Sequence, residues 1–89
     1  MNIGRIAGTV VCTKKVDKLS GFKLLLVRKL DVQAEPTKDF VVAVDCVGAG
    51  DGEKVLLVSG SSSRQTSKTQ GKPVDAAVIG IIDSVTINE

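Results

Sequence analysis

A short glycine-rich segment in the middle of the chain is the feature that most constrains its fold. Gly48-Ala49-Gly50-Asp51-Gly52 separates the apolar run Phe40 to Val47 from a second apolar run, Lys54 to Val58. The first run alternates in part, with Asp45 as its polar exception, which is typical of a strand. Because glycine adopts positive φ without a steric penalty, the segment between the runs predicts a tight turn. The sequence therefore predicts a hairpin whose loop contains the glycines.

Further strand-like segments lie on both sides of this turn. The first, Ile3 to Thr13, is expected to bend at Gly8. The second, Phe22 to Val32, is apolar on both faces. The third, Pro73 to Ile87, is expected to be a long closing strand with a bend at Gly80. The connections are the Asp31 to Asp39 loop, which contains Pro36, and Ser59 to Lys72, which predicts a short helix from about Ser61 and then a mobile loop. Residues 1–89 are therefore predicted to form a single all-β domain, a five-stranded antiparallel OB-like β-barrel with one short helix.

The composition favours an oligomer. Hydrophobic residues make up 43% of the 89 residues and aromatic residues only 2%, so the core is expected to consist of small aliphatic side chains. These apolar residues exceed what so small an interior hides, and contacts between copies would bury the excess. The 12 basic and 10 acidic residues are scattered and predict no polyanionic partner. No long apolar run or leader is visible, which predicts a cytoplasmic protein with no membrane partner.

The residues that usually carry catalysis or bind metals are scarce. The chain contains no histidine, the commonest general base and metal ligand. Cys12 and Cys46 lie in apolar strand-like runs and are expected to be reduced, structural thiols, too few for a structural zinc site. The carboxylates are expected to serve local roles, bonding to nearby backbone or to Arg64; they are Asp45, Asp51, Glu53, Asp75 and Asp83. We therefore expect no enzyme activity, no cofactor and no metal.

Two segments invite a phosphate or nucleic-acid interpretation. The glycine turn resembles a dinucleotide fingerprint, but its third glycine is misplaced and a strand follows where a helix is required. The serine-rich stretch from Ser59 to Lys68 is compatible with a phosphate nest, but a helix cap followed by a solvated loop is the favoured interpretation. An OB-type barrel also offers single-stranded nucleic-acid binding as an alternative function. That alternative lacks stacking platforms, since Phe22 and Phe40 are the only aromatic residues.

Four segments together resemble one known family, the small pentameric vertex proteins of bacterial microcompartment shells, of the ethanolamine-utilisation and carboxysome type. The matching segments are GTVVCTKK at 8–15, GFKLLLVR at 21–28, VAVDCVGAGDGEKVLLVSGSSSR at 42–64 and PVDAAVIGIIDSV at 73–85. The resemblance implies a homopentamer that caps the icosahedral vertices of a polyhedral shell, among hexameric microcompartment shell proteins. The amino-acid sequences of the last two segments resemble those of catabolic metabolosome members more than those of carboxysome members.

The resemblance also assigns individual residues. Gly48, Ala49, Gly50 and Gly52 match the family's glycine turn, and Ser63 stands where the family often has alanine. The candidate subunit interface consists of the residues that match the family's small-residue and arginine segment together with three aspartates: Ser61, Ser62, Arg64, Asp45, Asp75 and Asp83.

The assignment leads to a hypothesis about the contacts between subunits. A cyclic ring uses heterologous contacts, in which one face of a subunit meets a different face of its neighbour. We expect the excess apolar residues of the second and last strands to form this interface. We also expect Arg64 to pair with Asp45, Asp75 or Asp83, within a subunit or across the interface. A co-chaperonin-like barrel, which forms a ring of seven subunits, is the structural rival, but it carries an apolar mobile loop that this sequence lacks.

Overall fold

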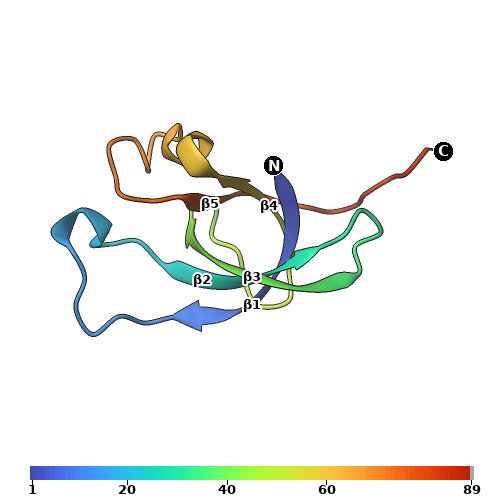
Figure 1. Cartoon of the computed structure of the whole chain (residues 1–89), viewed down its shortest axis with the longest axis horizontal. Helices are drawn as coiled ribbons and strands as arrows, with labels where there is room; N and C mark the ends of the chain where they lie inside the picture. Colours follow the sequence, from blue (N-terminus) through green and yellow to red (C-terminus); the bar gives the residue numbers. More distant parts are fainter. Residues whose placement is uncertain (89) are drawn as a thin grey trace.

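Five strands and two short 3-10 helices form the chain in the computed structural model, which describes residues 1–88 (Figure 1). The strands are β1 (Asn2–Val10), β2 (Leu24–Leu30), β3 (Pro36–Asp45), β4 (Lys54–Ser59) and β5 (Ala76–Ile81), and the 3-10 helices are η1 (Asp17–Leu19) and η2 (Gly60–Arg64). The predicted short helix is therefore present, one residue earlier than expected and as a 3-10 helix. The all-β prediction is confirmed.

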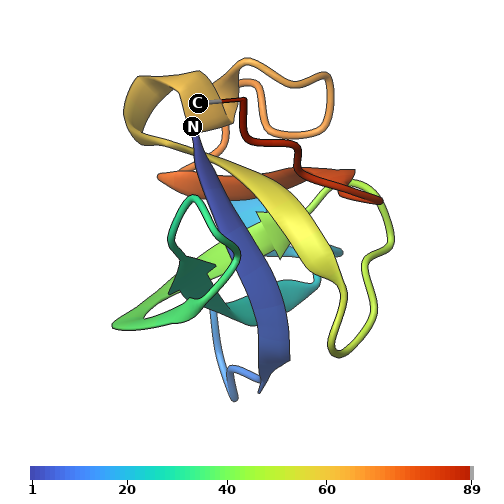
Figure 2. The same cartoon turned by 90° about the vertical axis from the view of Figure 1, so that its right-hand side faces the viewer.

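The strands close into a barrel in the order β1-β2-β3-β5-β4, and Figure 2 shows β1 and β4 side by side at its front. Four of the strand pairs are antiparallel, but β3 and β5 run parallel, with Val44 opposite Ala77 and Asp45 opposite Val78. The predicted five-stranded barrel is confirmed, and its one parallel pair departs from the predicted antiparallel pairing for a topological reason. Strand directions cannot alternate all the way round a closed ring of five, because five is odd, so one neighbouring pair must be parallel.

The predicted hairpin around the glycine turn is also wrong. β3 pairs with β2 and β5, whereas β4 pairs with β1 and β5, so the two strands that flank the turn are not hydrogen-bonded to each other. The last strand, β5, lies between them. The glycine segment is thus a crossing between two non-adjacent strands, and local sequence does not distinguish such a crossing from a hairpin.

Strand ends differ from the expected bounds, while the expected bends are confirmed. The Asp31 to Asp39 loop is shorter than predicted because β3 already begins at Pro36, and the closing strand is shorter because β5 ends at Ile81. The register between β1 and β2 shifts between Ile6 and Gly8, and the register between β4 and β5 shifts next to Gly80. Such bulges increase local twist, which helps a five-stranded sheet to close.

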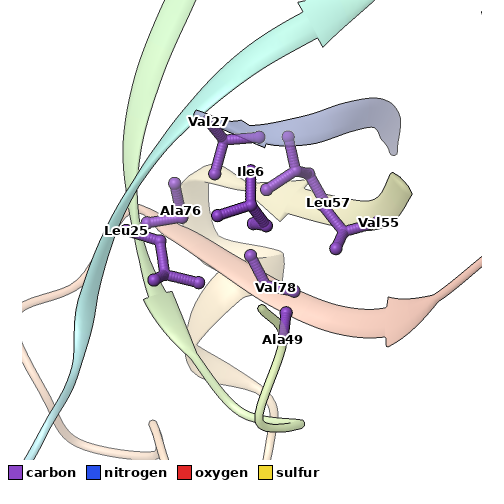
Figure 3. Packing of buried hydrophobic residues seen from close by; sticks show 9 residues of the cluster. Ile6, Leu25, Val27, Ala49, Val55, Leu57, Ala76 and Val78 are labelled. Carbon is purple, nitrogen blue, oxygen red and sulfur yellow. The ribbon is translucent and has the colours of Figure 1, made fainter. Parts of the chain in front are cut away.

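The barrel interior is filled by aliphatic side chains from all five strands and from the glycine turn (Figure 3). The central cluster is Ile6, Leu25, Val27, Ala43, Ala49, Val55, Leu57, Ala76 and Val78. Gly4 on β1 faces the same interior. A Cβ at Gly4 would overlap Val27 Cγ1 and lie 3.1 Å from Leu57 Cδ1, so the barrel leaves room for hydrogen only.

Two segments extend from the barrel and elongate the molecule to 45 × 24 × 20 Å. The β1–β2 connection, which includes η1, projects at one end, and the segment after β5 runs away from the barrel at the other (Figure 1). Neither 3-10 helix is of the length and apolarity that a membrane crossing requires, and the described residues contain no other helix.

Candidate functional site

The glycine turn is held in place by two carboxylates. Asp45 Oδ1 accepts hydrogen bonds from the amides of Val47, Gly48 and Ala49, at 3.0, 2.9 and 3.3 Å. At the far side of the turn, Glu53 Oε1 accepts a hydrogen bond of 2.6 Å from the Gly50 amide. Asp45 therefore organises the backbone of its own loop, as was expected of a polar interruption in a strand.

The same turn is anchored to the barrel at both ends. Ala49 is buried and belongs to the central core cluster, while Gly52 donates to the Ile6 carbonyl of β1 at 2.9 Å. Gly48 and Gly52 have φ of +76° and +81°, which non-glycine residues rarely adopt. The four residues matched to the family's turn thus form a fixed structural unit with an exposed outer edge.

A second unit is built around η2. The buried Ser63 hydroxyl lies 2.6 Å from the Gly60 carbonyl and 3.1 Å from the Val74 carbonyl, and it donates to them. Arg64 Nη1 also donates to the Val74 carbonyl, at 3.0 Å. The arginine therefore holds the start of the last strand against η2. Ser61 and Ser62 stay exposed on the outer side of the helix.

The predicted pairing of Arg64 with a carboxylate is not found within the subunit. In the part of the chain that the structure describes, the hydrogen bond from Arg64 goes to a backbone carbonyl, and Asp45 is engaged with its own loop. Asp75 and Asp83 are exposed. Pairing of Arg64 across a subunit interface, with Asp45, Asp75 or Asp83, stays a prediction.

The loop that follows η2 is less free than its composition suggests. Thr69 is fully buried, and its hydroxyl lies 2.6 Å from the hydroxyl of Thr66, which itself lies 3.9 Å from Cys46 Sγ. Lys68 Nζ reaches the Cys46 carbonyl at 3.4 Å. This burial could not be predicted from the sequence, because a solvated polar loop and a loop whose polar side chains hydrogen-bond to one another have the same composition.

The exposed apolar side chains lie only partly where we expected them. On β2, Leu25 and Val27 are buried in the barrel, so the expectation that the second strand supplies part of the interface stays a prediction for its half-buried residues Leu24 and Leu26. The exposed large apolar residues of the strands and of the segment after β5 are Phe40 and Val42 on β3, Ile81 on β5, and Val85 and Ile87 beyond it. Val42 is 45% exposed and Ile87 is 46% exposed, which is unfavourable in an isolated subunit.

The thiols and the aromatic rings also have different surroundings from those expected. Cys12 is exposed beyond the end of β1 instead of lying in a strand, whereas Cys46 is half-buried directly after β3. Phe22 packs against the second core cluster, and the guanidinium of Arg28 lies 4.2 Å from the ring centre of Phe40. Among residues 1–88, no group of three metal-ligating side chains comes together.

A row of basic residues that the sequence analysis did not predict crosses the outer face of the barrel. Arg5 on β1 lies directly opposite Arg28 on β2 and directly opposite Lys54 on β4. We call these three residues the cationic row. A hollow of about 550 Å³ adjoins it, lined by both arginines, by Leu30 and by Glu35.

An apolar hollow lies next to the cationic row along the same strands. It has a volume of about 340 Å³ and its apolar lining comes from Met1, Ile3, Leu30, Val32 and Leu56. Ile3 is directly opposite both Leu30 and Leu56 in the sheet. We call this feature the apolar hollow.

Comparison with known proteins identifies the chain. Residues 1–83 match the family model described as ethanolamine utilisation protein EutN/carboxysome. The bacterial microcompartment shell vertex protein EutN of Escherichia coli K12 is 48% identical, in an alignment that covers 96% of this chain and 90% of the relative. The carboxysome shell vertex protein CcmL of Gloeobacter violaceus is 46% identical, with 99% and 88% covered.

Solved structures agree with the sequence comparison. The structure of the Gloeobacter violaceus CcmL superposes with a TM-score of 0.94 at 45% identity, covering 99% of this chain and 91% of that one. GrpN of Rhodospirillum rubrum, named a pentameric microcompartment shell protein, gives a TM-score of 0.91 at 45% identity, covering 99% and 100%. The fold and these similarities define a structural protein of a microcompartment shell vertex. The chain belongs to the EutN/carboxysome family of ethanolamine utilisation and carboxysome proteins.

Proposed function

We propose that five copies of this chain close into a ring that caps a vertex of a polyhedral microcompartment shell, surrounded by hexameric shell proteins. The observation that carries the proposal is the match over the whole length of GrpN, which is named pentameric. A sheet of hexagonal units stays flat, and it closes into a polyhedron only where pentagonal units are inserted. The family's vertex role and a five-membered ring therefore belong to the same geometry.

The surface of the isolated subunit supports an assembled state. The exposed apolar residues on β3 and after β5 would be buried when a neighbouring copy covers them. Such burial stabilises the assembly by roughly 25 cal/mol per Å² of apolar surface. In a ring, each subunit offers one face to the neighbour before it and another to the neighbour after it, so a single good contact is repeated five times. The proposed role is architectural and requires no catalytic group.

Native mass spectrometry of the purified chain tests the ring directly. Five subunits of 9.3 kDa give an assembly of about 47 kDa, and this mass should persist on dilution to low subunit concentration. A ring of seven would favour the co-chaperonin-like rival instead. A monomer at every concentration would remove the vertex role and leave single-stranded nucleic-acid binding as the next hypothesis.

A second experiment tests the position of the ring. Hexameric shell proteins of the same compartment are expressed with and without this chain, and the particles are examined by electron microscopy. With the chain present, we expect closed polyhedra; without it, we expect shells that lack density at their vertices or sheets that do not close. Polyhedra that are equally complete in both preparations would contradict the capping role, even if the chain is a pentamer.

A further inference from the structure

The cationic row is electrostatically unfavourable in an isolated subunit. Side chains directly opposite each other on neighbouring strands lie about 5 Å apart at Cβ, and like charges in such positions destabilise a sheet. Arg28 is partly compensated, because its Nη1 donates to the Thr37 carbonyl at 2.9 Å and its guanidinium stacks on Phe40. Arg5 is exposed between two other cations. Glu35 lines the adjoining hollow together with both arginines, and a second anionic side chain, from outside the subunit, would relieve more of this repulsion.

The cationic row and the apolar hollow follow each other along β1. Ile3 and Arg5 are two residues apart on the strand, and the buried Gly4 between them faces the interior. Met1 precedes the strand with the same spacing. The outer face of β1 therefore presents a cation, an aliphatic side chain and a second aliphatic side chain, at steps of about 6.6 Å.

The segment after β5 carries the complementary pattern. Asp83, Val85 and Ile87 are each two residues apart and are all exposed, and Asp83 lies at a bend. A segment that is extended after this bend would place one anion and two aliphatic side chains on one face with the same step. The Ile82 amide donates to the Lys54 carbonyl at 2.9 Å, which fixes where this segment leaves the barrel. Beyond that point it runs away from its own subunit (Figure 1).

We propose that residues 83–87 of one copy lie across the outer face of a neighbouring copy, with Asp83 at the cationic row and with Val85 and Ile87 over the apolar hollow. The occupant is a second copy of this chain, and the argument rests on complementary charge and matched spacing. β1 is hydrogen-bonded to β2 and β4 on its two sides, so the contact is made by side chains and not by strand addition. The inference rests on the proposed ring and assigns one of its heterologous contacts.

Disulfide trapping tests the contact directly. In a background with Cys12→Ser and Cys46→Ser, the pair Ile3→Cys with Val85→Cys is oxidised in the assembled protein and run on a denaturing, non-reducing gel. We expect a ladder of linked subunits that ends at the pentamer. The matched control is Val16→Cys with Val85→Cys, since Val16 is exposed but lies in the projecting β1–β2 connection, and it should give no ladder.

A charge exchange between Asp83 and Arg5 tests the proposed electrostatic contact between neighbouring copies. Asp83→Lys places a fourth cation at the row, so the subunit concentration at which half of the rings dissociate should rise roughly fivefold. Arg5→Asp alone should weaken the ring as well, and the double variant should restore the parent's dissociation profile. The double variant tests the pairing itself, because damage to folding by either change would not be reversed by the other.

The outcomes separate this inference from the proposed function. A pentameric parent that gives no intersubunit ladder, or only a link within one subunit, overturns the inference and leaves the vertex role standing. Additive weakening in the double variant also overturns it. A parent that is not a pentamer overturns both.

Discussion

Gly4 is the position where the barrel has least room, and Gly4→Ala tests how tightly the interior is packed. The added methyl group would overlap Val27 Cγ1 and press on Leu57 Cδ1. Strand β1 cannot move away, because it is paired on both sides by β2 and β4. Both side chains must therefore leave their preferred rotamers, at roughly 0.5–1.5 kcal/mol each. Alanine recovers roughly 0.5–1 kcal/mol of strand stability relative to glycine. The net loss is therefore roughly 0–2.5 kcal/mol, with a midpoint near 1 kcal/mol.

Urea unfolding at a fixed subunit concentration measures this loss, since the stability of an oligomer depends on concentration. The matched control is Gly8→Ala on the same strand, where an added Cβ has no atom within 4 Å, and which should be neutral or slightly stabilising. Combining Gly4→Ala with Val27→Ala should cost less than the sum of the two changes, because the new methyl group fills part of the vacated space. Equal effects of Gly4→Ala and Gly8→Ala, or strict additivity in the double variant, would refute the argument.

Three further substitutions test the hydrogen bonds that hold the glycine turn and those that hold η2. Asp45→Ala leaves three loop amides without their acceptor and should lower the free energy of unfolding by about 1–3 kcal/mol, while Asp45→Asn keeps an acceptor oxygen and should lose less. Ser63→Ala should cost under about 1 kcal/mol in thermal unfolding, because Arg64 still donates to the Val74 carbonyl; a larger loss would show that the arginine does not compensate. Arg64→Ala should lower both the melting temperature and the stability of the ring, and a variant that assembles with unchanged stability would rule out any pairing of Arg64 with the candidate aspartates.

The sequence predicted the strands better than their pairing. Runs of β-branched and aliphatic residues mark each strand locally, so the predicted bounds agree with all five strands to within a few residues, except at the C-terminal end of the last strand. Pairing between β3 and β5 joins residues far apart in the sequence, and no local pattern encodes it. The glycine turn, with an apolar run on each side, fits the pattern of a hairpin loop and is nevertheless a crossing between strands that are not neighbours.

The same distinction holds for the candidate site. The role of Asp45 in its own loop could be predicted because donor and acceptor lie within four residues of each other. The cationic row could not, since Arg5, Arg28 and Lys54 become neighbours only once two strand registers are known. The burial of Ser63 and Thr69 was likewise invisible, because it depends on how the loop after η2 folds back on the barrel.

The position of β5 between β3 and β4 has a consequence for biosynthesis. As the chain emerges from the ribosome, β1 can pair with β2 and β2 with β3, but β3 and β4 each keep one open edge until residues 76–81 arrive. Open strand edges are templates for pairing with other chains. The last strand to be synthesised is thus the one that seals the barrel, so a nascent subunit stays vulnerable to aggregation until translation is nearly complete.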